Sequence, residues 1–327
     1  MMLDIVGKRY YYFALSLLVI IPGVISLLLP GGLRPGIDFS SGSIMTIRFE
    51  QPVDQADLRS EFAAMGHSEA IVQKSGGSEG TTFLVRTYTL PPEQKDASGN
   101  VVEASGRQKV EDALEAKFGA MEVLAFDSVS PIIAGEIVRN AVIAVAVASV
   151  GILLYIAYAF RRVKDSFRLG TCAVIALVHD SLIVLGAFSL MGRFFDVELD
   201  SMFITAVLTI IGFSVHDTIV VFDRIRENTA RRISDRLEDV INHSIMQTLV
   251  RSLNTSITVL LVLVALYLFG GVTTQNFVLA LIIGMVAGVY SSIFVAASLL
   301  VVWERGEIKA GWRRLFGGQK AARAASS

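Results

Sequence analysis

Residues 201–222 read SMFITAVLTIIGFSVHDTIVVF, an apolar run with one acid, Asp217, inside it. A bilayer's hydrocarbon core requires roughly 20 apolar residues in a helix. A charge at the centre of such a helix costs on the order of 3 kcal/mol, so acids found there usually have a function. The run therefore predicts a membrane span and makes Asp217 its candidate functional residue.

The composition of the whole chain fits a bilayer better than water. Of the 327 residues, 53% are hydrophobic, and the formal net charge is −1. Nucleic-acid binders carry a basic stripe, so we expect no nucleic acid among the partners. The single cysteine, Cys172, excludes an internal disulfide and a cysteine metal cluster. No Walker loop, dinucleotide fingerprint or metal-ligand histidine pair is present. We expect no cofactor, no metal and no enzyme activity.

Five further apolar runs have the length of a span. The six predicted spans are 11–29, 136–160, 169–191, 201–222, 248–270 and 277–303. The first run lacks a small-x-small cleavage site, so we interpret it as an anchor that is not removed.

The segments that connect the spans sort by charge. Arg and Lys gather at 8–9, 161–168, 224–236 and 305–323, whereas the acids of loop 192–200 outnumber its one arginine. The side of a membrane that is richer in Lys and Arg is cytoplasmic. This rule predicts cytoplasmic N- and C-termini, and it places the long insertion 30–131 outside the membrane.

The insertion has the alternation and turn signals of a soluble domain. Strands are predicted at 43–49, 70–74, 82–88 and 121–126, helices at 54–64 and 107–118, and a flexible loop at 91–106. The order β-α-β-β-α-β is ferredoxin-like. The expected fold class is a polytopic α-helical membrane protein, with six transmembrane helices and one α+β ferredoxin-like extracytoplasmic domain between helices 1 and 2. The other parts are 1–29 (N-terminus and first span), 132–303 (bundle of the other five) and 304–327 (basic cytoplasmic tail).

The stretch 223–247 is charged and helical in period, with Leu237, Ile241 and Ile245 on one face. This pattern is typical of an amphipathic helix at a membrane surface. We expect such a helix on the cytoplasmic side.

Two polar stripes mark the candidate site. The stripe of the fifth span consists of Gln247, Arg251, Asn254 and Thr258, and that of the fourth consists of Ser214, Asp217 and Thr218. Lipid does not favour such stripes, so we expect them to face each other across a hydrated seam. Arg251 and Asp217 would lie at similar depth on antiparallel helices, which makes Arg251 the candidate partner.

Other interpretations of single residues stay open. Arg251 could extend to the membrane interface, or its pair with Asp217 could be purely structural, but neither explains the whole stripe. Asp180 in the third span fits both an interhelical hydrogen bond and direct proton transfer. His179 and His216 each precede an acid, but adjacent helical side chains point about 100° apart. We therefore expect neither histidine to share a face with the acid that follows it. A packing or supporting role is favoured for both histidines.

The spacing of Gly284 and Gly288 in the sixth span indicates helix packing.

Three motifs resemble a known family. Residues 212–228 read GFSVHDTIVVFDRIREN, residues 247–256 read QTLVRSLNTS, and residues 36–39 read GIDF. In their order along the chain, 36–39, 212–228 and 247–256, and within a six-span plan, they resemble the SecF family of the resistance-nodulation-division superfamily over nearly the whole chain. The chain departs from the family pattern at His216, usually Asn, at Ser41, usually Gly, and at Ser130-Pro131, where Gly-Pro usually stands.

The resemblance implies a role in protein export. Members pair with SecD in the bacterial inner membrane and use the proton motive force to assist late translocation of secreted chains through the SecYEG channel, and YajC is a further candidate partner. Asp217 and Arg251 match the family's proton-path residues. Possible supporting residues are Asp180, His216, Ser214, Thr218, Gln247, Asn254 and Thr258. The external motif comprises Gly36, Asp38, Phe39 and Gly42.

Two other functions share the intramembrane acid. A half-size, proton-coupled small-molecule exporter of the same superfamily would have to pair with another chain, because such exporters typically have twice as many spans. An intramembrane aspartyl protease would need Asp180 and Asp217 to share a proton. Asp217 lacks the Gly-x-Gly-Asp setting of those enzymes, and Asp180 is predicted to lie deeper.

Overall fold

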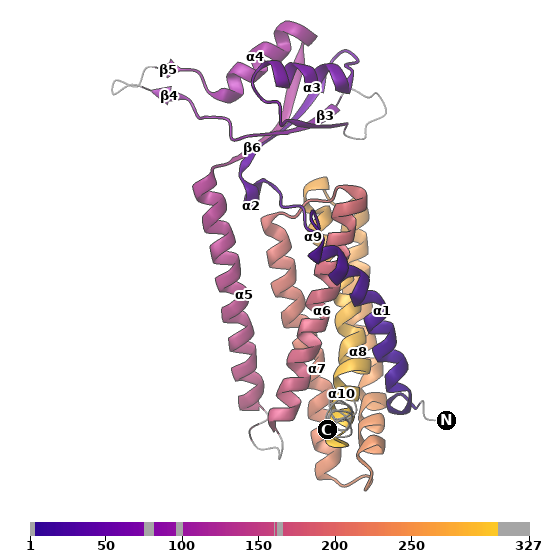
Figure 1. Cartoon of the computed structure of the whole chain (residues 1–327). Helices are drawn as coiled ribbons and strands as arrows, with labels where there is room; N and C mark the ends of the chain where they lie inside the picture. Colours follow the sequence, from indigo (N-terminus) through magenta and orange to yellow (C-terminus); the bar gives the residue numbers. More distant parts are fainter. Residues whose placement is uncertain (1–3, 75–81, 96–100, 160, 162–165, 307–327) are drawn as a thin grey trace, which may run out of the picture. The chain divides into compact units, whose positions relative to one another are not determined.

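The computed structural model describes residues 4–74, 82–95, 101–159, 161 and 166–306. The chain forms two compact units (Figure 1). The membrane unit consists of Met1–Arg34 and Ile143–Ser327, and the head unit is Pro35–Val142. Arg162, Lys164 and the basic residues of the tail 307–327 lie outside the described residues.

The head unit contains a four-stranded antiparallel sheet with the strand order β2-β3-β1-β6. Its elements are α2 (Ile37–Ser40), β1 (Gly42–Phe49), α3 (Gln55–Ala64), β2 (Ile71–Lys74), β3 (Thr82–Thr87), α4 (Gly106–Phe118) and β6 (Met121–Val129). This is the β-α-β-β-α-β order of the prediction. The segment predicted as a flexible loop contains a short antiparallel ladder of β4 (Gln94–Lys95) and β5 (Val101–Glu103), so that prediction was wrong for these residues.

Alternation in the strands places the core of the head unit on one face of the sheet. Ile47 and Phe49 of β1 are buried against Leu58 of α3 and Leu114 of α4. Asp54 caps α3, because its carboxylate accepts a hydrogen bond from the Ala56 amide at 2.7 Å. His67 Nδ1 lies 3.0 Å from Thr87 Oγ1, and burial lowers the pKa of His67.

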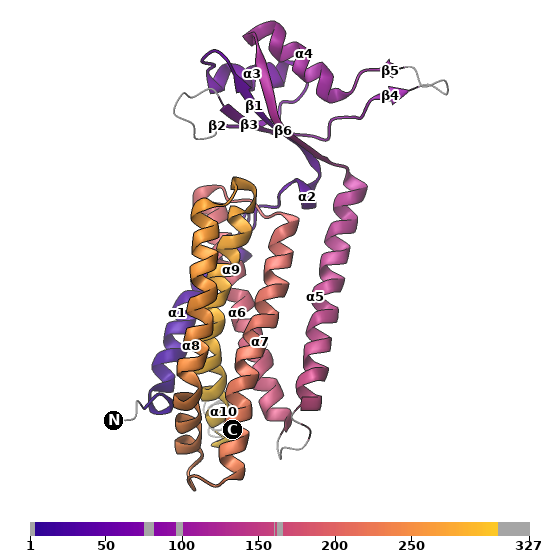
Figure 2. The same cartoon turned by 180° about the vertical axis from the view of Figure 1, so that it is seen from behind.

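Six helical segments are long and apolar enough to cross a membrane, which confirms the predicted number among the described residues. They are α1 (Arg9–Leu28), preceded by the 3-10 turn η1 (Val6–Lys8), α5 (Pro131–Ala159), α6 (Ser166–Phe195), α7 (Ser201–Ala230), α8 (Leu237–Phe269) and a sixth built from α9 (Val272–Tyr290), the π-helix η2 (Ser291–Ala296) and α10 (Ala297–Glu304). The helices α6 to α9 lie side by side (Figures 1 and 2). The boundary between the two units falls within α5, between Val142 and Ile143.

No separate surface helix exists among the described residues 223–247. Instead, α7 continues to Ala230, and α8 begins at Leu237 and runs without interruption through the fifth span. Ile241 and Ile245 are fully buried in the bundle core, where Leu237 packs as well. The predicted amphipathic helix was wrong, because an apolar stripe shows that a face is covered but not whether lipid or protein covers it.

Glycines let pairs of helices touch in the membrane unit. Gly23 of α1 lies against Gly186 of α6, and a Cβ added to Gly186 would lie 2.8 Å from the Gly23 Cα. Gly284 and Gly288 of α9 lie against Ile210 and Ser214 of α7, as expected for packing glycines.

Gly186→Ala should therefore destabilise the bundle. The added methyl group meets backbone, which cannot move aside as a side chain can, and overpacking of this kind costs about 1–3 kcal/mol. The free energy of unfolding in mixed detergent micelles measures the loss. Gly212→Ala is the matched control, because an added Cβ there has open space. Equal stabilities of the two variants would contradict the close approach of α1 and α6.

Candidate functional site

Asp217 lies in the centre of the candidate site, on α7. Its side chain is 7% exposed, and Oδ1 accepts a hydrogen bond from Ser252 Oγ of α8 at 2.7 Å. The other oxygen, Oδ2, is buried and has no hydrogen-bond partner within the described part of the chain. A buried carboxylate with a bare oxygen is costly, whereas the protonated acid is not charged. The geometry makes Oδ2 an atom that can take up and release a proton.

Arg251 forms no hydrogen bond or ion pair with Asp217 among the described residues, although its positive charge acts on that carboxylate. Among the described residues, the carboxylate is held by Ser252 alone, and Arg251 is exposed on the outer surface of α8. The whole predicted stripe is exposed with it: Gln247, Arg251, Asn254 and Thr258. Of these four residues, only Gln247 hydrogen-bonds to α7 among the described residues, so the prediction that the whole stripe faces α7 was wrong. Spacing shows that residues share a face of a helix, but it does not show which neighbour that face meets.

A different stripe of α8 faces the bundle. It recurs every four residues and is formed by the buried side chains of Ser244, Thr248, Ser252 and Ser256. Apart from Ser252, these hydroxyls bond to backbone carbonyls of their own helix at 2.7–3.0 Å. Such small side chains allow α7 and α8 to approach closely. The regular spacing of hydroxyls was visible in the sequence and could have identified Ser252.

At one end of this contact Asn228 of α7 joins both stripes. Its Nδ2 donates to Ser244 Oγ at 2.8 Å and to Gln247 Oε1 at 3.0 Å. Gln247 is thus the member of the predicted stripe that bonds to α7.

The second acid, Asp180 of α6, is 1% exposed and hydrogen-bonded on both oxygens. Its Oδ2 accepts from Ser214 Oγ of α7 at 2.5 Å and from Ser291 Oγ of η2 at 2.8 Å. Its Oδ1 lies 2.9 Å from His179 Nδ1. Asp180 therefore joins three helical segments, and Ser214 belongs to its surroundings rather than to those of Asp217.

The two histidines behave differently from each other. His179 is buried and turns toward Asp180, so the expectation that adjacent residues do not meet was wrong there. The angle of about 100° separates the Cβ directions, but the imidazole and the carboxylate reach back to a common point. His216 is exposed while Asp217 is buried, in agreement with that expectation.

Hydroxyl groups connect the surroundings of the two acids. Thr218, next to Asp217, has its Oγ1 2.9 Å from Ser292 Oγ, which donates to the backbone carbonyl of Ser214 at 3.3 Å. The wide turn of η2 buries both Ser291 and Ser292 completely and directs them to different partners. Turns of this type occur frequently at functional sites.

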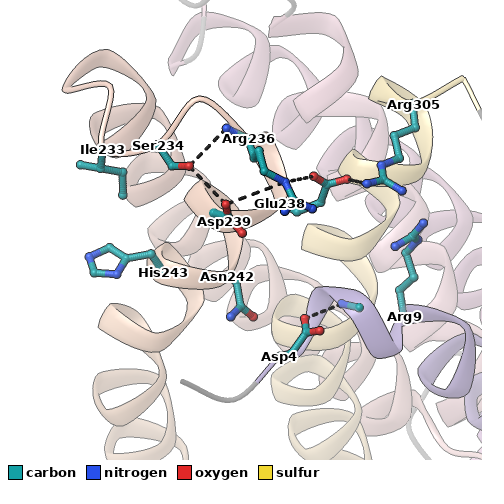
Figure 3. Close-up of a pocket in the computed structure, with 11 residues that line it drawn as sticks. Asp4, Arg9, Ile233, Ser234, Arg236, Glu238, Asp239, Asn242, His243 and Arg305 are labelled. Carbon is teal, nitrogen blue, oxygen red and sulfur yellow. Dashed lines mark hydrogen bonds and ion pairs between the residues drawn. The ribbon is translucent and has the colours of Figure 1, made fainter. Parts of the chain in front are cut away.

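A separate pocket of about 810 Å³ lies where the start of the chain meets the start of α8 (Figure 3). Its lining contains Asp4, Gly7, Arg9, Ile233, Ser234, Arg236, Glu238, Asp239, Asn242, His243 and Arg305. Arg305 pairs with Glu238, and Arg236 lies 4.0 Å from both Glu238 and Asp239. Neither Asp180 nor Asp217 lines it, so the pocket is no part of the acid site.

No group of three or more His, Cys, Asp and Glu side chains that could hold a metal ion occurs in the described part of the chain.

Comparison with known proteins decides the family. The family model "Protein export membrane protein SecD/SecF, C-terminal" matches residues 109–306, and the "SecD/SecF GG Motif" matches residues 31–53. The chain belongs to the SecD/SecF family. A protein translocase subunit SecF from Thermobaculum terrenum is 51% identical over 96% of this chain and 98% of its own length. One from Anaerolinea thermophila is 41% identical over the full length of both.

Solved structures of SecD/SecF proteins have the same fold. A crystal structure of SecDF from Thermus matches with a TM-score of 0.75 and 33% identity, and it covers 93% of this chain. SecDF in a super-membrane-facing form matches with a TM-score of 0.61 and 30% identity over 100% of this chain. The chain spans only 39% and 40% of those two SecDF chains.

The GG motif of the SecD/SecF family lies at the start of the head unit. Gly36 precedes α2, which contains Asp38 and Phe39, and Gly42 begins β1. Gly42 has a φ of 134°, and a Cβ on it would lie 2.8 Å from the Thr87 carbonyl oxygen. Ser41 also has a positive φ, of 61°, where glycine is favoured. The local turn thus explains why the family usually has glycine at both positions.

Ser252→Ala should destabilise the chain while Asp217 is ionised. The change removes a hydrogen bond to a charged group, worth about 1.5–3 kcal/mol. Unfolding free energies in mixed micelles measure it, and the same change in an Asp217→Leu background should cost little. Thr255→Ala is the control, since Thr255 is exposed one turn away and bonds its own backbone. An equal loss in both backgrounds would refute the contact.

Proposed function

We propose that this chain is an accessory subunit of the Sec protein-export machinery. It acts with SecD and uses the proton motive force to assist late translocation of secreted polypeptides through the SecYEG channel. The observation that carries the proposal is Asp217, an intramembrane carboxylate with one oxygen held by Ser252 and the other without a partner among the described residues. Relatives that cover the full chain are named translocase subunits, which supports this function over that of a small-molecule exporter or a protease.

Charge gives the proposed orientation in the membrane. Lys8, Arg168, Arg224 and Arg305 lie in or next to the helix ends on one side of the six spans, and that side is the cytoplasm by the positive-inside rule. Both termini are then cytoplasmic, and the head unit is external to the bacterial inner membrane. There it can meet a polypeptide that emerges from the channel.

Proton uptake at Asp217 is the proposed switch. Protonation removes the charge and turns Oδ2 into a possible donor, so the contact between α7 and α8 can repack. Each proton that crosses about 100 mV releases roughly 2.3 kcal/mol. This free energy is comparable to the few kcal/mol that separate two conformations of a protein. The head unit would hold or release the emerging chain as the bundle changes state.

SecD is the proposed occupant of the exposed polar stripe on α8. Arg251, Asn254 and Thr258 are polar side chains within a span, and lipid is a poor solvent for them. The solved SecDF chains contain more than this chain does, since it spans about 40% of their length. A SecD chain would shield the stripe and bring Arg251 into a shared proton path. YajC is a further candidate partner.

Asp217→Asn should abolish the gradient-dependent part of export. The amide cannot exchange a proton, so translocation of a secreted protein into vesicles that contain SecD and SecYEG should fall to the rate without this chain. The matched control is Asp223→Asn on the same helix, where the acid is exposed and pairs with Arg226. Unchanged export by Asp217→Asn would refute the role of Asp217.

Cross-linking should locate SecD. Cys172 is the single cysteine and is buried, so a Cys172→Ala background leaves no other thiol. In that background Thr258→Cys should form cross-links to SecD with a short bifunctional reagent. Leu18→Cys, on an exposed face of α1, should react with the reagent without capturing SecD. Capture from Leu18 but not from Thr258 would show that SecD lies on another face.

A further inference from the structure

We propose that His179 and Asp180 together bind a second proton at a site separate from Asp217, and that the hydroxyl of Ser16 transmits its occupancy to α9. The inference concerns a group of buried residues that the proposed action of Asp217 does not use. It rests on the number of hydrogens that these residues have available for their observed contacts.

A chain of four contacts leads from Asp180 to α1 and α9. His179 Nδ1 lies 2.9 Å from Asp180 Oδ1, and His179 Nε2 lies 3.0 Å from Ser16 Oγ. Ser16 Oγ donates to Tyr290 Oη at 3.4 Å, and Tyr290 Oη donates to the Tyr12 carbonyl at 2.7 Å. The His179 and Tyr290 rings are stacked with centroids 6.2 Å apart, which fixes the imidazole between the helices.

The available hydrogens determine the protonation state. Tyr290 has one O–H, which the Tyr12 carbonyl takes, so Ser16 must supply the hydrogen between itself and Tyr290. Ser16 also has only one hydrogen, and its contact with His179 must then be donated by Nε2. All contacts are satisfied together only when His179 carries a proton on Nε2.

The two states differ by one proton. In the loaded state the His179–Asp180 pair holds two protons, one between Nδ1 and Oδ1 and one on Nε2, and the pair is neutral overall. In the unloaded state it holds one proton, Nε2 becomes an acceptor, and the Ser16 hydroxyl turns to it and leaves Tyr290. The proton belongs to the pair rather than to either residue. Asp180 is 1% exposed, and the loaded state avoids a net buried charge there.

Few other titratable groups face this pair. Tyr290 faces it from α9 and Tyr12 lies on α1, while η2 contributes the hydroxyls of Ser291 and Ser292. On α7 the buried acid is Asp217, which accepts its hydrogen bond from Ser252.

The other charged or titratable groups on elements packed against α6 have positions or partners away from the pair. On α7, His216 is exposed, and Asp223 and Glu227 pair with arginines of their own helix. On α1, Arg9 donates to the Val6 carbonyl, and on α10 the acid is Glu304. It pairs with Arg168, near the other end of α6.

The site controls a contact of the first span. In the loaded state Ser16 joins α1 to α9 through Tyr290, and in the unloaded state it bonds α6 alone. Nearer the C-terminal end of α1, the helix stays attached to α6 in both states. Gly23 contacts Gly186 there, and a bond of 2.7 Å joins Ser26 and Ser189. Proton occupancy therefore makes or breaks one of the two hydrogen bonds between α1 and α9, that of Ser16, while the bond from Tyr290 to the Tyr12 carbonyl is present in both states.

Nitrogen NMR of the native chain in lipid nanodiscs tests the proposal. The chain has four histidines, and labelling them with 15N allows His179 to be assigned by its loss in His179→Gln. Between low and high pH the Nε2 signal of His179 should change from protonated to unprotonated, while Nδ1 stays hydrogen-bonded. A single Nε2 state throughout the range in which the chain stays folded would overturn the proposal.

Tyr290→Phe tests the link through Ser16. Without the phenol oxygen, the loaded state loses one hydrogen bond of about 0.5–1.5 kcal/mol. At a fixed pH the ratio of Nε2-protonated to unprotonated His179 should fall about two- to tenfold. Tyr267→Phe on α8 is the control and should leave the ratio unchanged. An unchanged ratio in Tyr290→Phe would refute the role of Ser16.

Asp217→Asn separates this site from the proposed function. His179 should titrate in that variant as in the native chain, because its proton is held by Asp180 and Ser16. Loss of the His179 transition in Asp217→Asn would show that the two acids form one site and would overturn the proposal of a second one. Failure of export in the same variant would leave the result for His179 unaffected.

Discussion

Lipid cannot hydrogen-bond a polar side chain, so each polar group inside this bundle must find its partner within the protein. Hydroxyl side chains meet most of this requirement. They line the buried face of α8 and the contacts of α6, α7 and η2, and they bond to a carboxylate, to a backbone carbonyl or to another hydroxyl. Because they are small, they satisfy the acids without separating the helices. The close packing of the bundle and the placement of its acids follow from the same residues.

The two acids differ in how completely this requirement is met. Asp180 has three neighbours within hydrogen-bond distance on three helical segments, which suits an acid that holds the bundle together. Asp217 has one bond and one bare oxygen. Environments that differ in this way give two carboxylates different roles within one fold. The proton site proposed at His179 and Asp180 adds a third case. There Asp180 keeps its hydrogen bonds whether or not Nε2 of His179 carries a proton.

Long patterns in the sequence were sufficient to predict the larger features. Six apolar runs gave the six spans, and alternation with turn signals gave the ferredoxin-like order of the head unit. Asp217 was identified because an acid stands out in an apolar run. Arg251 was predicted as the partner of Asp217, but the hydrogen bond comes from Ser252. The helix α8 has polar residues on two sides, and charge drew attention to the exposed side. The helix predicted near 223–247 failed for a related reason, since Ile241 and Ile245 are covered by protein.

The π-helix η2 could not be predicted from the spacing of apolar residues. Its wide turn affects how the two ends of the sixth span can move relative to each other. An α-helix has 3.6 residues per turn, and η2 contains a wider turn between α9 and α10. If that turn tightened to an α-helix, the residues beyond it would rotate about the helix axis by roughly 100° for each residue displaced. The sixth span thus contains a turn, where Ser291 of η2 donates to Asp180, about which its two ends can rotate relative to each other. Gly284 and Gly288 could remain against α7 while the end of the span at Glu304 turned.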